Sequence, residues 1–335
     1  MRHLILGCGP AGIAAAKAIR AAEKDAEIVI ATEEAFARPY IRPLLPDYIA
    51  GDIPLDALAD PQGVDLAMNR IEVRQGKRAR KVDAEGRRVS FEDGTAEGYD
   101  SLLLATGGKP LLPSPLDRHP KAVVPFDSLS DAKRIRERAA VPGPIVVYGP
   151  GYLGIEACRS LARRGRMVVW IKPVPSRFGY SISGEFEARV LDEVSRRGVR
   201  IQEGDDIIFL RELDESFFEV RCLDGRDIRC SMIVAAAERL PAVAFLKGSG
   251  VKVGTGIVVD DGLRTSAPHV YAAGDCAELY DGKTGEVRIN FGWRSAVKLG
   301  KLAGENMAGG GKVYIRNRED YTWLLTGASL LDRLK

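Results

Sequence analysis

The chain has 335 residues, enough for about two domains that each bury a core. Its 49 lysines and arginines nearly balance 46 aspartates and glutamates, so the formal net charge of +3 excludes the strongly basic surface of a nucleic-acid-binding protein. No apolar run approaches the roughly 20 residues that span a bilayer, and the five cysteines show no metal-ligand spacing. We therefore expect a cytoplasmic protein without a metal site or a disulfide framework.

The first elements are a strand, a glycine loop and a helix. An apolar strand leads into Gly-Cys-Gly-Pro-Ala-Gly at residues 7–12, a helix is predicted over 11–22, and a second strand over 27–31. In a G-x-G-x-x-G loop the first glycine makes the turn, the second lets a pyrophosphate approach, and the third packs helix against strand. Glu33 follows Gly12 by 21 residues, which is the spacing of a carboxylate that binds an adenosine ribose; a simple loop cap is the alternative.

A rigid loop, short strands and a linker follow. The prolines within residues 38–46 exclude regular helix there. Residues 71–104 alternate short β-like runs with turns and end in a buried strand that opens on Ala105-Thr106-Gly107. A proline-rich linker over 110–120 and a helix over 131–140 complete this part of the chain.

A second glycine loop repeats the first pattern. Gly-Pro-Gly-Tyr-Leu-Gly at residues 149–154 follows a buried strand and precedes a helix, and two such loops in one chain are hard to obtain by chance. A strand over 167–171 and a helix over 185–196 come next, and a final helix is predicted over 294–307. The sequence thus predicts an α/β fold of two Rossmann-like dinucleotide-binding domains, the second inserted in the first.

Four motifs in this order resemble the FAD-dependent pyridine nucleotide-disulfide oxidoreductase superfamily: the two glycine loops, Ala105-Thr106-Gly107 and Tyr271-Ala272-Ala273-Gly274-Asp275. The loop at 39–51 is most similar to the branch containing NADH:rubredoxin reductase and the nitrite reductase flavin module. The resemblance implies an FAD-binding domain over 1–110 and 248–335 and an NAD(P)H-binding domain over 111–247. The C-terminal interface domain of that family is expected to be missing or reduced, which indicates a monomer or one subunit of a hetero-oligomer.

The resemblance also implies which residues bind the cofactors. Those expected at FAD lie in the first loop, after two strand ends and at the Gly-Asp pair: Gly7, Gly9, Pro10, Ala11, Gly12, Glu33, Ala105, Thr106, Gly107, Gly274 and Asp275. Those expected at the nicotinamide nucleotide are Gly149, Gly151, Tyr152, Leu153, Gly154, Glu156, Lys172 and Arg177, with Arg42 as a further cofactor-binding residue. A turn cap is the alternative role for Asp275.

Three side chains are candidates for the active site: Glu156, Arg42 and Trp293. Glu156 matches a family glutamate near the flavin and nicotinamide rings that often pairs with a lysine, but here the lysine position holds Asp47. Two carboxylates cannot form an ion pair, so either Glu156 pairs with Arg42 or one carboxylate stays protonated. Trp293 either covers the flavin or packs in the core.

The choice between NADH and NADPH depends on the end of the strand at 167–171. The family's NADH-binding members usually carry an acid there, whereas this chain has Lys172, and Arg177 follows closely. Two cations can clamp a 2′-phosphate, which favours NADPH. Gly154 is more typical of NADH sites, and a solvated strand end is the other interpretation of Lys172.

Disulfide reductases of this family need two thiols beside the flavin, and their single-cysteine relatives need one in the loop that aligns with Pro43. This chain has no cysteine between Cys8 and Cys158, which excludes dithiol chemistry. The flavin must then pass electrons to a one-electron carrier, a quinone or dye, or dioxygen. A cluster of cations predicts either a docking face for an acidic carrier such as rubredoxin or ferredoxin, or a solvated hairpin. Its members are Arg70, Arg74, Lys77, Arg78, Arg80, Lys81, Arg87 and Arg88.

The sequence therefore predicts an FAD-dependent NAD(P)H oxidoreductase that passes a hydride from nicotinamide to flavin and electrons to a small redox protein. One alternative is the flavin subunit of a substrate dehydrogenase or oxidase complex. The other is a non-catalytic nucleotide-sensing flavoprotein, which Lys172 and the change to Ala237 near a family glycine position would fit.

Overall fold

A computed structural model describes the chain except residues 36–38, 175–183, 237, 281–286, 290–291 and 316–335. The described residues form two compact units. Unit 1 contains Met1–Tyr40, Ala59–Lys109 and the described part of Leu240–Trp323. Unit 2 contains Pro110–Arg239, apart from its undescribed residues, together with the N-terminal segment Ile41–Leu58.

Unit 1 is built on a five-stranded parallel sheet with the order β19-β7-β1-β2-β3. Leu4 pairs with Val29 on one side and with Leu102 on the other, and the interior residues of β1, β2 and β7 are buried. Continuous apolar runs of this kind are typical of parallel strands covered on both faces. The strands are β1 (Arg2–Leu6), β2 (Glu27–Ala31), β3 (Ile71–Arg74), β7 (Ser101–Leu104) and β19 (Val270–Ala272).

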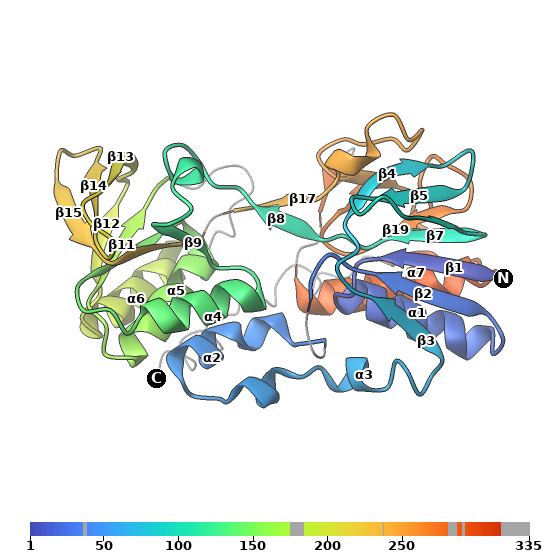
Figure 1. The fold of residues 1–335 in the computed structure, drawn as a ribbon, viewed down its shortest axis with the longest axis horizontal. Helices are drawn as coiled ribbons and strands as arrows, with labels where there is room; N and C mark the ends of the chain where they lie inside the picture. The colour runs from blue at the N-terminus through green and yellow to red at the C-terminus, as the bar shows by residue number, and fades with distance from the viewer. Residues whose placement is uncertain (36–38, 175–183, 237, 281–286, 290–291, 316–335) are drawn as a thin grey trace. The chain divides into compact units, whose positions relative to one another are not determined.

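Two helices, α1 (Pro10–Ala22) and α7 (Trp293–Met307), lie together on one side of this sheet (Figure 1). Small residues allow the close contact. A β-carbon added at Gly300 would overlap the backbone of Ala11, and one added at Gly304 would overlap that of Ala15. The α7 glycines therefore fix the position of α1, and with it the position of the glycine loop from which α1 begins.

The smaller elements of unit 1 cover the other side of the sheet and its edges. The antiparallel β4-β5-β6 sheet contributes Val82, Val89 and Phe91 to the same core as the parallel sheet. The remaining elements are α3 (Pro61–Val64), β4 (Ala79–Asp83), β5 (Arg88–Phe91), β6 (Ala96–Gly98), η4 (Ala244–Leu246), β18 (Ile257–Val259), β20 (Ala277–Tyr280) and β21 (Val287–Arg288). Two of the unit boundaries fall within strands, namely β8 (Gly108–Pro110) and β17 (Arg239–Pro241).

Unit 2 has a second five-stranded parallel sheet, with the order β12-β11-β10-β16-β9. Figure 1 shows helices α4, α5 and α6 on one side of it and the antiparallel β13-β14-β15 sheet farther out. The parallel strands are β9 (Val123–Pro125), β10 (Ile145–Tyr148), β11 (Val168–Lys172), β12 (Arg200–Glu203) and β16 (Met232–Ala235). The other elements are η3 (Leu116–Arg118), α4 (Leu129–Arg138), α5 (Gly151–Arg163), α6 (Gly184–Arg196), β13 (Ile207–Glu212), β14 (Phe218–Cys222) and β15 (Asp227–Cys230).

The proline-rich segment differs from its prediction. It forms η1 (Arg42–Leu44), the short helix α2 (Leu45–Ala50) and, farther on, η2 (Leu55–Leu58). The expectation that the prolines exclude a regular helix was wrong, because Pro46 lies in the first turn of α2, where a missing N–H breaks no helical hydrogen bond. Gly51 ends α2 with φ +90°.

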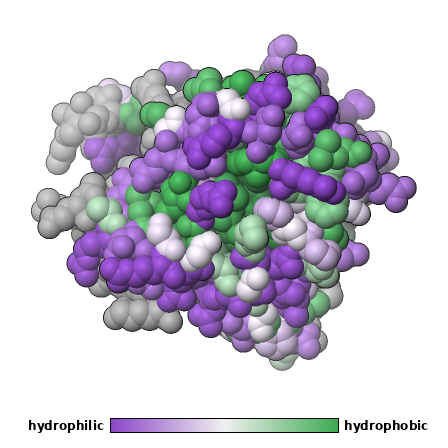
Figure 2. All heavy atoms as spheres, turned by 90° about the vertical axis from the view of Figure 1, so that its left-hand side faces the viewer, coloured by the Kyte–Doolittle hydropathy of each residue, from purple (hydrophilic) through white to green (hydrophobic). Residues whose placement is uncertain are grey.

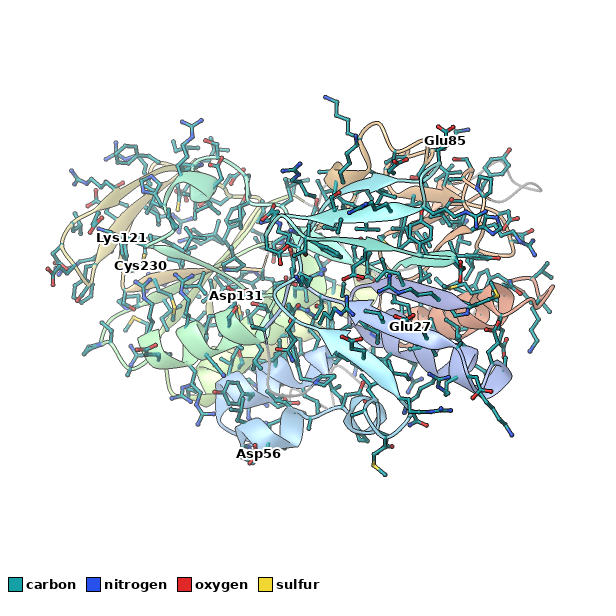
Figure 3. All side chains as sticks on the ribbon, turned by 45° about the vertical axis from the view of Figure 1, so that its right-hand side comes forward. Glu27, Asp56, Glu85, Lys121, Asp131 and Cys230 are labelled. Carbon is teal, nitrogen blue, oxygen red and sulfur yellow. The ribbon has the colours of Figure 1, made fainter. Side chains whose placement is uncertain are left out.

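The predicted parallel-sheet fold with two Rossmann-like cores is confirmed, and most elements lie within two residues of their predicted bounds. Helix α4 gains a start signal in Ser128, whose hydroxyl and backbone N–H form a capping box with Asp131, labelled in Figure 3. Within the described residues, no helix is both long and apolar enough to cross a membrane. The side of unit 2 that carries β13-β14-β15 has apolar patches between charged residues (Figure 2), and Ile208, Phe209 and Leu223 of these hairpins are exposed.

Candidate functional site

The first glycine loop is closed by backbone at both ends and open in the middle. Gly7 leaves β1 with φ +112°, and its N–H donates to the Ala31 oxygen at 2.8 Å. A β-carbon at Gly7 would overlap the Ala105 oxygen, and one at Gly12 would overlap the Gly7 oxygen. A β-carbon at Gly9 would meet no described heavy atom within 4 Å. Open space at the second glycine is what the approach of a pyrophosphate requires.

The start of α1 suits an anion. Gly9 is its N-cap, Pro10 occupies its first position, and no side chain caps it. No acidic residue lies in the first turn, so the N-terminal N–H groups and the positive end of the helix dipole meet no carboxylate of their own helix. This geometry fits the pyrophosphate of a dinucleotide.

The other FAD motifs lie at the same edge of unit 1. The neighbouring parallel strands β1, β7 and β19 end there, so their following loops meet. Gly274, with φ +80°, approaches Ala11 so closely that a β-carbon on it would lie 3.1 Å from the Ala11 Cβ. The Thr106 hydroxyl donates to the Ala242 oxygen at 2.9 Å, and Gly107, with φ +64°, follows. The structure thus brings together three motifs that are far apart in the sequence.

Glu33 lies just past β2 with its side chain 45% exposed. Two cations approach one of its carboxylate oxygens, Lys109 Nζ at 3.2 Å and Arg78 Nε at 3.4 Å. The carboxylate is therefore accessible to ribose hydroxyls and is held by charges from two other segments. Both cations were missed as partners of Glu33, because neither is near it in the sequence.

Asp275 and Trp293 lie at the start of α7. The Gly292 N–H donates to Asp275 Oδ1 at 3.2 Å, one residue before the helix. Trp293 is the first residue of α7 and is half-buried, so it is not enclosed in the core as the packing alternative required. The contact between Gly292 and Asp275 attaches the start of α7 to the loop that follows β19.

The second glycine loop, in unit 2, has the same spacing as the first but a different backbone conformation, because its helix has Pro150 rather than the second glycine as its N-cap. Gly149 and Gly151 have φ of +140° and +69°, and α5 begins at Gly151 without a side-chain cap or an acidic residue in its first turn. Tyr152 and Leu153 are half-buried in that turn. A β-carbon at Gly154 would lie 2.7 Å from the Gly149 oxygen and 2.9 Å from Trp170, whose Nε1 donates to that oxygen. The glycine at 154 thus has a packing reason independent of coenzyme choice.

Glu156 is fully buried and its cation is Arg159. The Arg159 Nε and Nη2 donate to Glu156 Oε2 at 3.1 and 2.8 Å, and Nη2 also donates to Asp47 Oδ1 at 2.5 Å. One guanidinium thus lies between the two carboxylates, an arrangement that neither predicted alternative contained. The sequence offered a signal, because Arg159 follows Glu156 by three residues on the same helix.

Arg42 contacts another acid. Its Nη1 donates to the Asp127 oxygen at 2.6 Å and lies 3.4 Å from the Asp127 carboxylate, which also pairs with Arg239. These contacts attach η1 to the segment before α4. The suggested Glu156–Arg42 pair is therefore replaced by two separate clusters, each containing an arginine from within unit 2.

Lys172 is neither solvated nor an isolated cation. Its side chain, at the end of β11, is only 10% exposed. Nζ lies 2.6 Å from Glu187 Oε1 of α6 and 3.6 Å from Glu203 Oε2 at the end of β12. The interpretation of Lys172 as a solvated strand end was wrong. Arg177, the second member of the predicted clamp, lies outside the described residues, as does Ala237.

The cysteines are all buried and unpaired. Burial raises the pKa of Cys8 to about 12, with Glu34 and Asp60 adding to the effect, and burial raises that of Cys158 well above its ordinary value. Burial also raises the pKa of the Cys276 thiol. These thiols are protonated at neutral pH, so the buried cysteines act as small packing residues rather than as nucleophiles.

Three side chains that could bind a metal lie together in unit 2, one after β12 and two at the turn between β14 and β15. Ligand atoms of Asp205, Cys222 and Asp224 lie within 4.8 Å of one another. Arg226 pairs with Asp224 and lies 4.0 Å from Asp205, so one of the two acidic charges is compensated by a neighbouring cation.

About half of the predicted basic cluster is paired with acids. Arg70 lies 3.7 Å from Asp25, Lys77 pairs with Asp93, Arg78 contacts Glu33 and Glu92, and Arg74 pairs with Glu72 and Glu97. The cations of the β4-β5 hairpin, whose turn Glu85 marks in Figure 3, are exposed and have no ion-pair partner among the described residues. They are Arg80, Lys81, Arg87 and Arg88.

Comparisons with known proteins agree with this geometry. The chain is 29% identical over 309 residues to an NADH-rubredoxin oxidoreductase of Clostridium acetobutylicum, covering 91% of this chain and 74% of that protein. It is 27% identical over 312 residues to the NADH-dependent phenylglyoxylate dehydrogenase subunit epsilon of Aromatoleum evansii, with shares of 92% and 72%. A solved ferredoxin reductase for the CYP199A2 system of Rhodopseudomonas palustris matches with TM-score 0.86 and 26% identity, covering 94% of this chain and 78% of that one.

Residues 1–298, which are most of the chain, match the model of the pyridine nucleotide-disulphide oxidoreductase family. The resemblance inferred from the four motifs is confirmed, and so are the two cofactors, FAD and NADH or NADPH. The chain belongs to the pyridine nucleotide-disulphide oxidoreductase family and is a flavin-dependent oxidoreductase.

Proposed function

We propose that this chain takes a hydride from NADH onto FAD and delivers the electrons to a small, acidic electron-carrier protein. The observation that carries the proposal is the presence, in each unit, of a glycine loop at the end of a parallel β-strand that runs into an uncapped helix. We assign FAD to the loop of unit 1 and the nicotinamide nucleotide to the loop of unit 2. The likeness to an NADH-rubredoxin oxidoreductase supports the direction of electron flow.

The side chains of this chain bind and orient rather than move protons. When bound, FAD accepts a hydride and can release electrons singly. The open space at Gly9 and the N-terminus of α1 would hold one pyrophosphate, and Glu33 would accept hydroxyl hydrogens of the adenosine ribose. Asp275 would hydrogen-bond the ribityl chain. Positioning of two rings supplies most of the rate of a hydride transfer, so loss of a binding residue is expected to slow it.

The contacts of Lys172 favour NADH over NADPH. Glu187 and Glu203 together more than neutralise its charge, leaving a net charge of −1 in this group. A 2′-phosphate would be repelled by the two carboxylates unless they moved, whereas ribose hydroxyls can donate to a carboxylate. The carboxylate that relatives place at the strand end would thus be supplied here by Glu203 or Glu187.

The exposed cations of the β4-β5 hairpin support docking of an acidic carrier. Arg80, Lys81, Arg87 and Arg88 have no ion-pair partner in the described part of the chain, in contrast to Arg74, Lys77 and Arg78. Complementary charge chiefly raises the rate of encounter and makes it sensitive to salt. Rubredoxin-like and ferredoxin-like proteins are the chemical class that fits.

Anaerobic stopped-flow absorbance of the FAD-loaded protein tests the reductase. NADH is expected to bleach the flavin band, and NADPH to bleach it more slowly or only at higher concentration. Absence of bleaching by either nucleotide would overturn the proposal and favour the nucleotide-sensing alternative. Titration calorimetry with ADP-ribose and its 2′-phosphate tests coenzyme choice without any chemistry.

Docking is tested by reduction of a rubredoxin and a ferredoxin at increasing ionic strength. We expect the second-order rate constant to fall with salt. Charge reversal at Arg80, Lys81, Arg87 and Arg88 should lower that rate constant by about tenfold at low salt while flavin reduction by NADH is unchanged. A control with Arg118→Glu, an exposed arginine of unit 2, should have a smaller effect.

A second candidate function is the flavin subunit of a larger dehydrogenase complex. It is favoured by the likeness to the phenylglyoxylate dehydrogenase subunit epsilon. Under this alternative, NAD⁺ would accept electrons from the flavin, and free rubredoxin or ferredoxin would be reduced slowly at any salt concentration. Rapid exchange of electrons with NADH together with slow reduction of both carriers would favour the subunit.

A further inference from the structure

A buried group of three charges connects the second glycine helix to α2. Arg159 and Glu156 are both on α5, with side chains 2% and 1% exposed. Asp47, in the first turn of α2, is 21% exposed and binds the same Arg159 nitrogen as Glu156 does. All three residues belong to unit 2, although Asp47 is more than a hundred positions earlier in the sequence.

Arg159 stabilises the two carboxylates in the protein interior by pairing with both of them. Burial opposes a charged guanidinium, but Glu156 and Asp47 outweigh that effect and raise the pKa of Arg159 above its ordinary value. A buried carboxylate is strongly disfavoured unless it is paired and hydrogen-bonded. Two carboxylates within reach of one nitrogen would otherwise repel each other, and one would bind a proton.

Neighbouring elements add further charged groups around α5, which packs against α2, β10, β11 and α6. On β10, the Tyr148 hydroxyl donates to Asp206, and at the end of β11, Lys172 is held by Glu187 of α6 and by Glu203. Cys158 on α5 itself is a neutral thiol, because burial raises its pKa. Tyr148 and Lys172 thus have partners of their own among the described residues, and Cys158 carries no charge.

The same face of α5 and the adjacent α4 hold α2 by further arginines. Arg164 donates to the Ile49 oxygen at 3.2 Å, Arg136 donates to the Tyr48 oxygen and lies over its ring, and Arg163 pairs with Asp52 at 3.0 Å. Only Arg159 among them also binds Glu156. Attachment of α2 and control of the Glu156 charge are therefore separable by mutation.

We propose that Arg159 is a positioning residue that holds Glu156 as an ionised carboxylate for hydride transfer. The inference rests on the proposed function and on the position near the flavin and nicotinamide rings that the family resemblance implies for Glu156. The nicotinamide ring becomes positively charged as it gives up its hydride, and an ionised carboxylate stabilises that charge. Arg159 would act only through Glu156, by fixing its charge and its rotamer.

The pH dependence of flavin reduction tests this role. With wild-type protein and excess NADH, we expect the rate constant to change little between about pH 6 and pH 9. In Arg159→Met, Glu156 is expected to take up a proton at neutral pH. The rate should then be at least about tenfold lower at pH 7 and should rise toward the wild-type value as pH increases through a single ionisation.

Three further variants separate charge control from simple attachment. Arg159→Lys keeps a cation and should restore most of the rate and remove the ionisation. Arg163→Met loses a contact between α5 and the α2 segment but leaves Glu156 paired, so it should show no new ionisation. Arg159→Met combined with Glu156→Gln should be slow and independent of pH.

A measurement without nicotinamide distinguishes failure of this inference from failure of the proposed function. Infrared spectra of FAD-loaded Arg159→Met at pH 7 should contain the C=O stretch of a protonated carboxyl group, absent from the wild type and from the double variant. Unfolding gives the same information, because Glu156 ionises in the unfolded chain above about pH 4.3. Arg159→Met should therefore lose stability relative to wild type as pH rises from about 5 to 8.

Two results would overturn the inference. One is a rate in Arg159→Met that is low at every pH without a protonated-carboxyl signal, which would make Arg159 a purely structural residue. The other is a new ionisation of equal size in Arg163→Met, which would assign the effect to detachment of α2. If NADH fails to reduce even the wild type while the infrared signal appears, the charge control of Glu156 stands and the proposed function falls.

Discussion

The two glycine loops share one spacing but differ in what surrounds them. In unit 1 a β-carbon on the third glycine, Gly12, would overlap the Gly7 oxygen and would lie no closer than 3.2 Å to a side chain. In unit 2 a β-carbon on Gly154 would lie 2.7 Å from backbone and 2.9 Å from the ring of Trp170. The charge after the following strand also differs, since Glu33 is half-exposed with two cations beside it and Lys172 is buried between two acids. A shared motif therefore specifies the turn. Residues from elsewhere in the chain specify how well a larger residue is tolerated at the third glycine and which charge lies after the following strand.

The largest effect is expected at Gly12. A β-carbon there overlaps the Gly7 oxygen, and because that oxygen belongs to the backbone and a β-carbon has a fixed position on the backbone, no side-chain rotation can relieve the overlap. We expect Gly12→Ala to destabilise the FAD-free protein by about 3 kcal/mol or more. Urea unfolding of FAD-free protein measures this.

Gly9→Ala is the matched control for Gly12→Ala. Gly9 has φ −83° and open space around it, so alanine should cost under about 1 kcal/mol of stability. It should nevertheless weaken FAD binding by at least about tenfold, because the methyl group fills the space assigned to the pyrophosphate. Equal destabilisation by the two substitutions would contradict the difference between a closed and an open glycine.

A smaller, conditional effect is expected at Gly154. Gly154→Ala should cost about 1–3 kcal/mol, since its β-carbon is 2.7 Å from the Gly149 oxygen and 2.9 Å from Trp170. Trp170→Phe shortens the ring that causes part of the clash. The double variant should therefore be more stable than the sum of the single effects predicts, by about 1 kcal/mol. Strict additivity in urea unfolding would mean that the ring does not limit the site.

The sequence predicted the two glycine loops, the strands and helices that flank them, and the fold class, because these follow from local spacing and hydrophobic runs. It did not predict Lys109 beside Glu33, or Glu187 and Glu203 around Lys172, because long-range side-chain pairs leave no local pattern. The helix at 45–50 was missed for another reason: Pro46 was interpreted as a breaker, although a first-turn proline is compatible with a helix. Arg159 was the one missed partner with a local signal, the i,i+3 spacing from Glu156.

The charge after the second strand also differs between the two units, and removing the acids around Lys172 would change it in unit 2. Glu187→Gln with Glu203→Gln would leave Lys172 with an uncompensated charge, so the affinity for the 2′-phosphate of ADP-ribose should rise about tenfold relative to ADP-ribose, or roughly 1.4 kcal/mol. Titration calorimetry measures both ligands. Glu193→Gln, on the same helix but paired with Arg197, is the control with equal loss of charge per site. An unchanged preference in the double variant would show that Lys172 does not face the ribose.

The smallest effect concerns the cysteines that accompany each loop, Cys8 within the first and Cys158 after the second. Burial raises the pKa of both thiols, that of Cys8 to about 12, so they stay protonated in the folded chain while the unfolded chain ionises above about pH 8.5. The stability that a buried neutral thiol contributes is complete below that pH and is lost as pH rises toward the folded pKa. Between pH 8 and about 9.3, the stability advantage of wild type over Cys158→Ala should shrink by about 1 kcal/mol in urea unfolding. An advantage that stays constant or grows would mean that the folded chain holds a thiolate, and thiol chemistry beside the second loop would then have to be reconsidered.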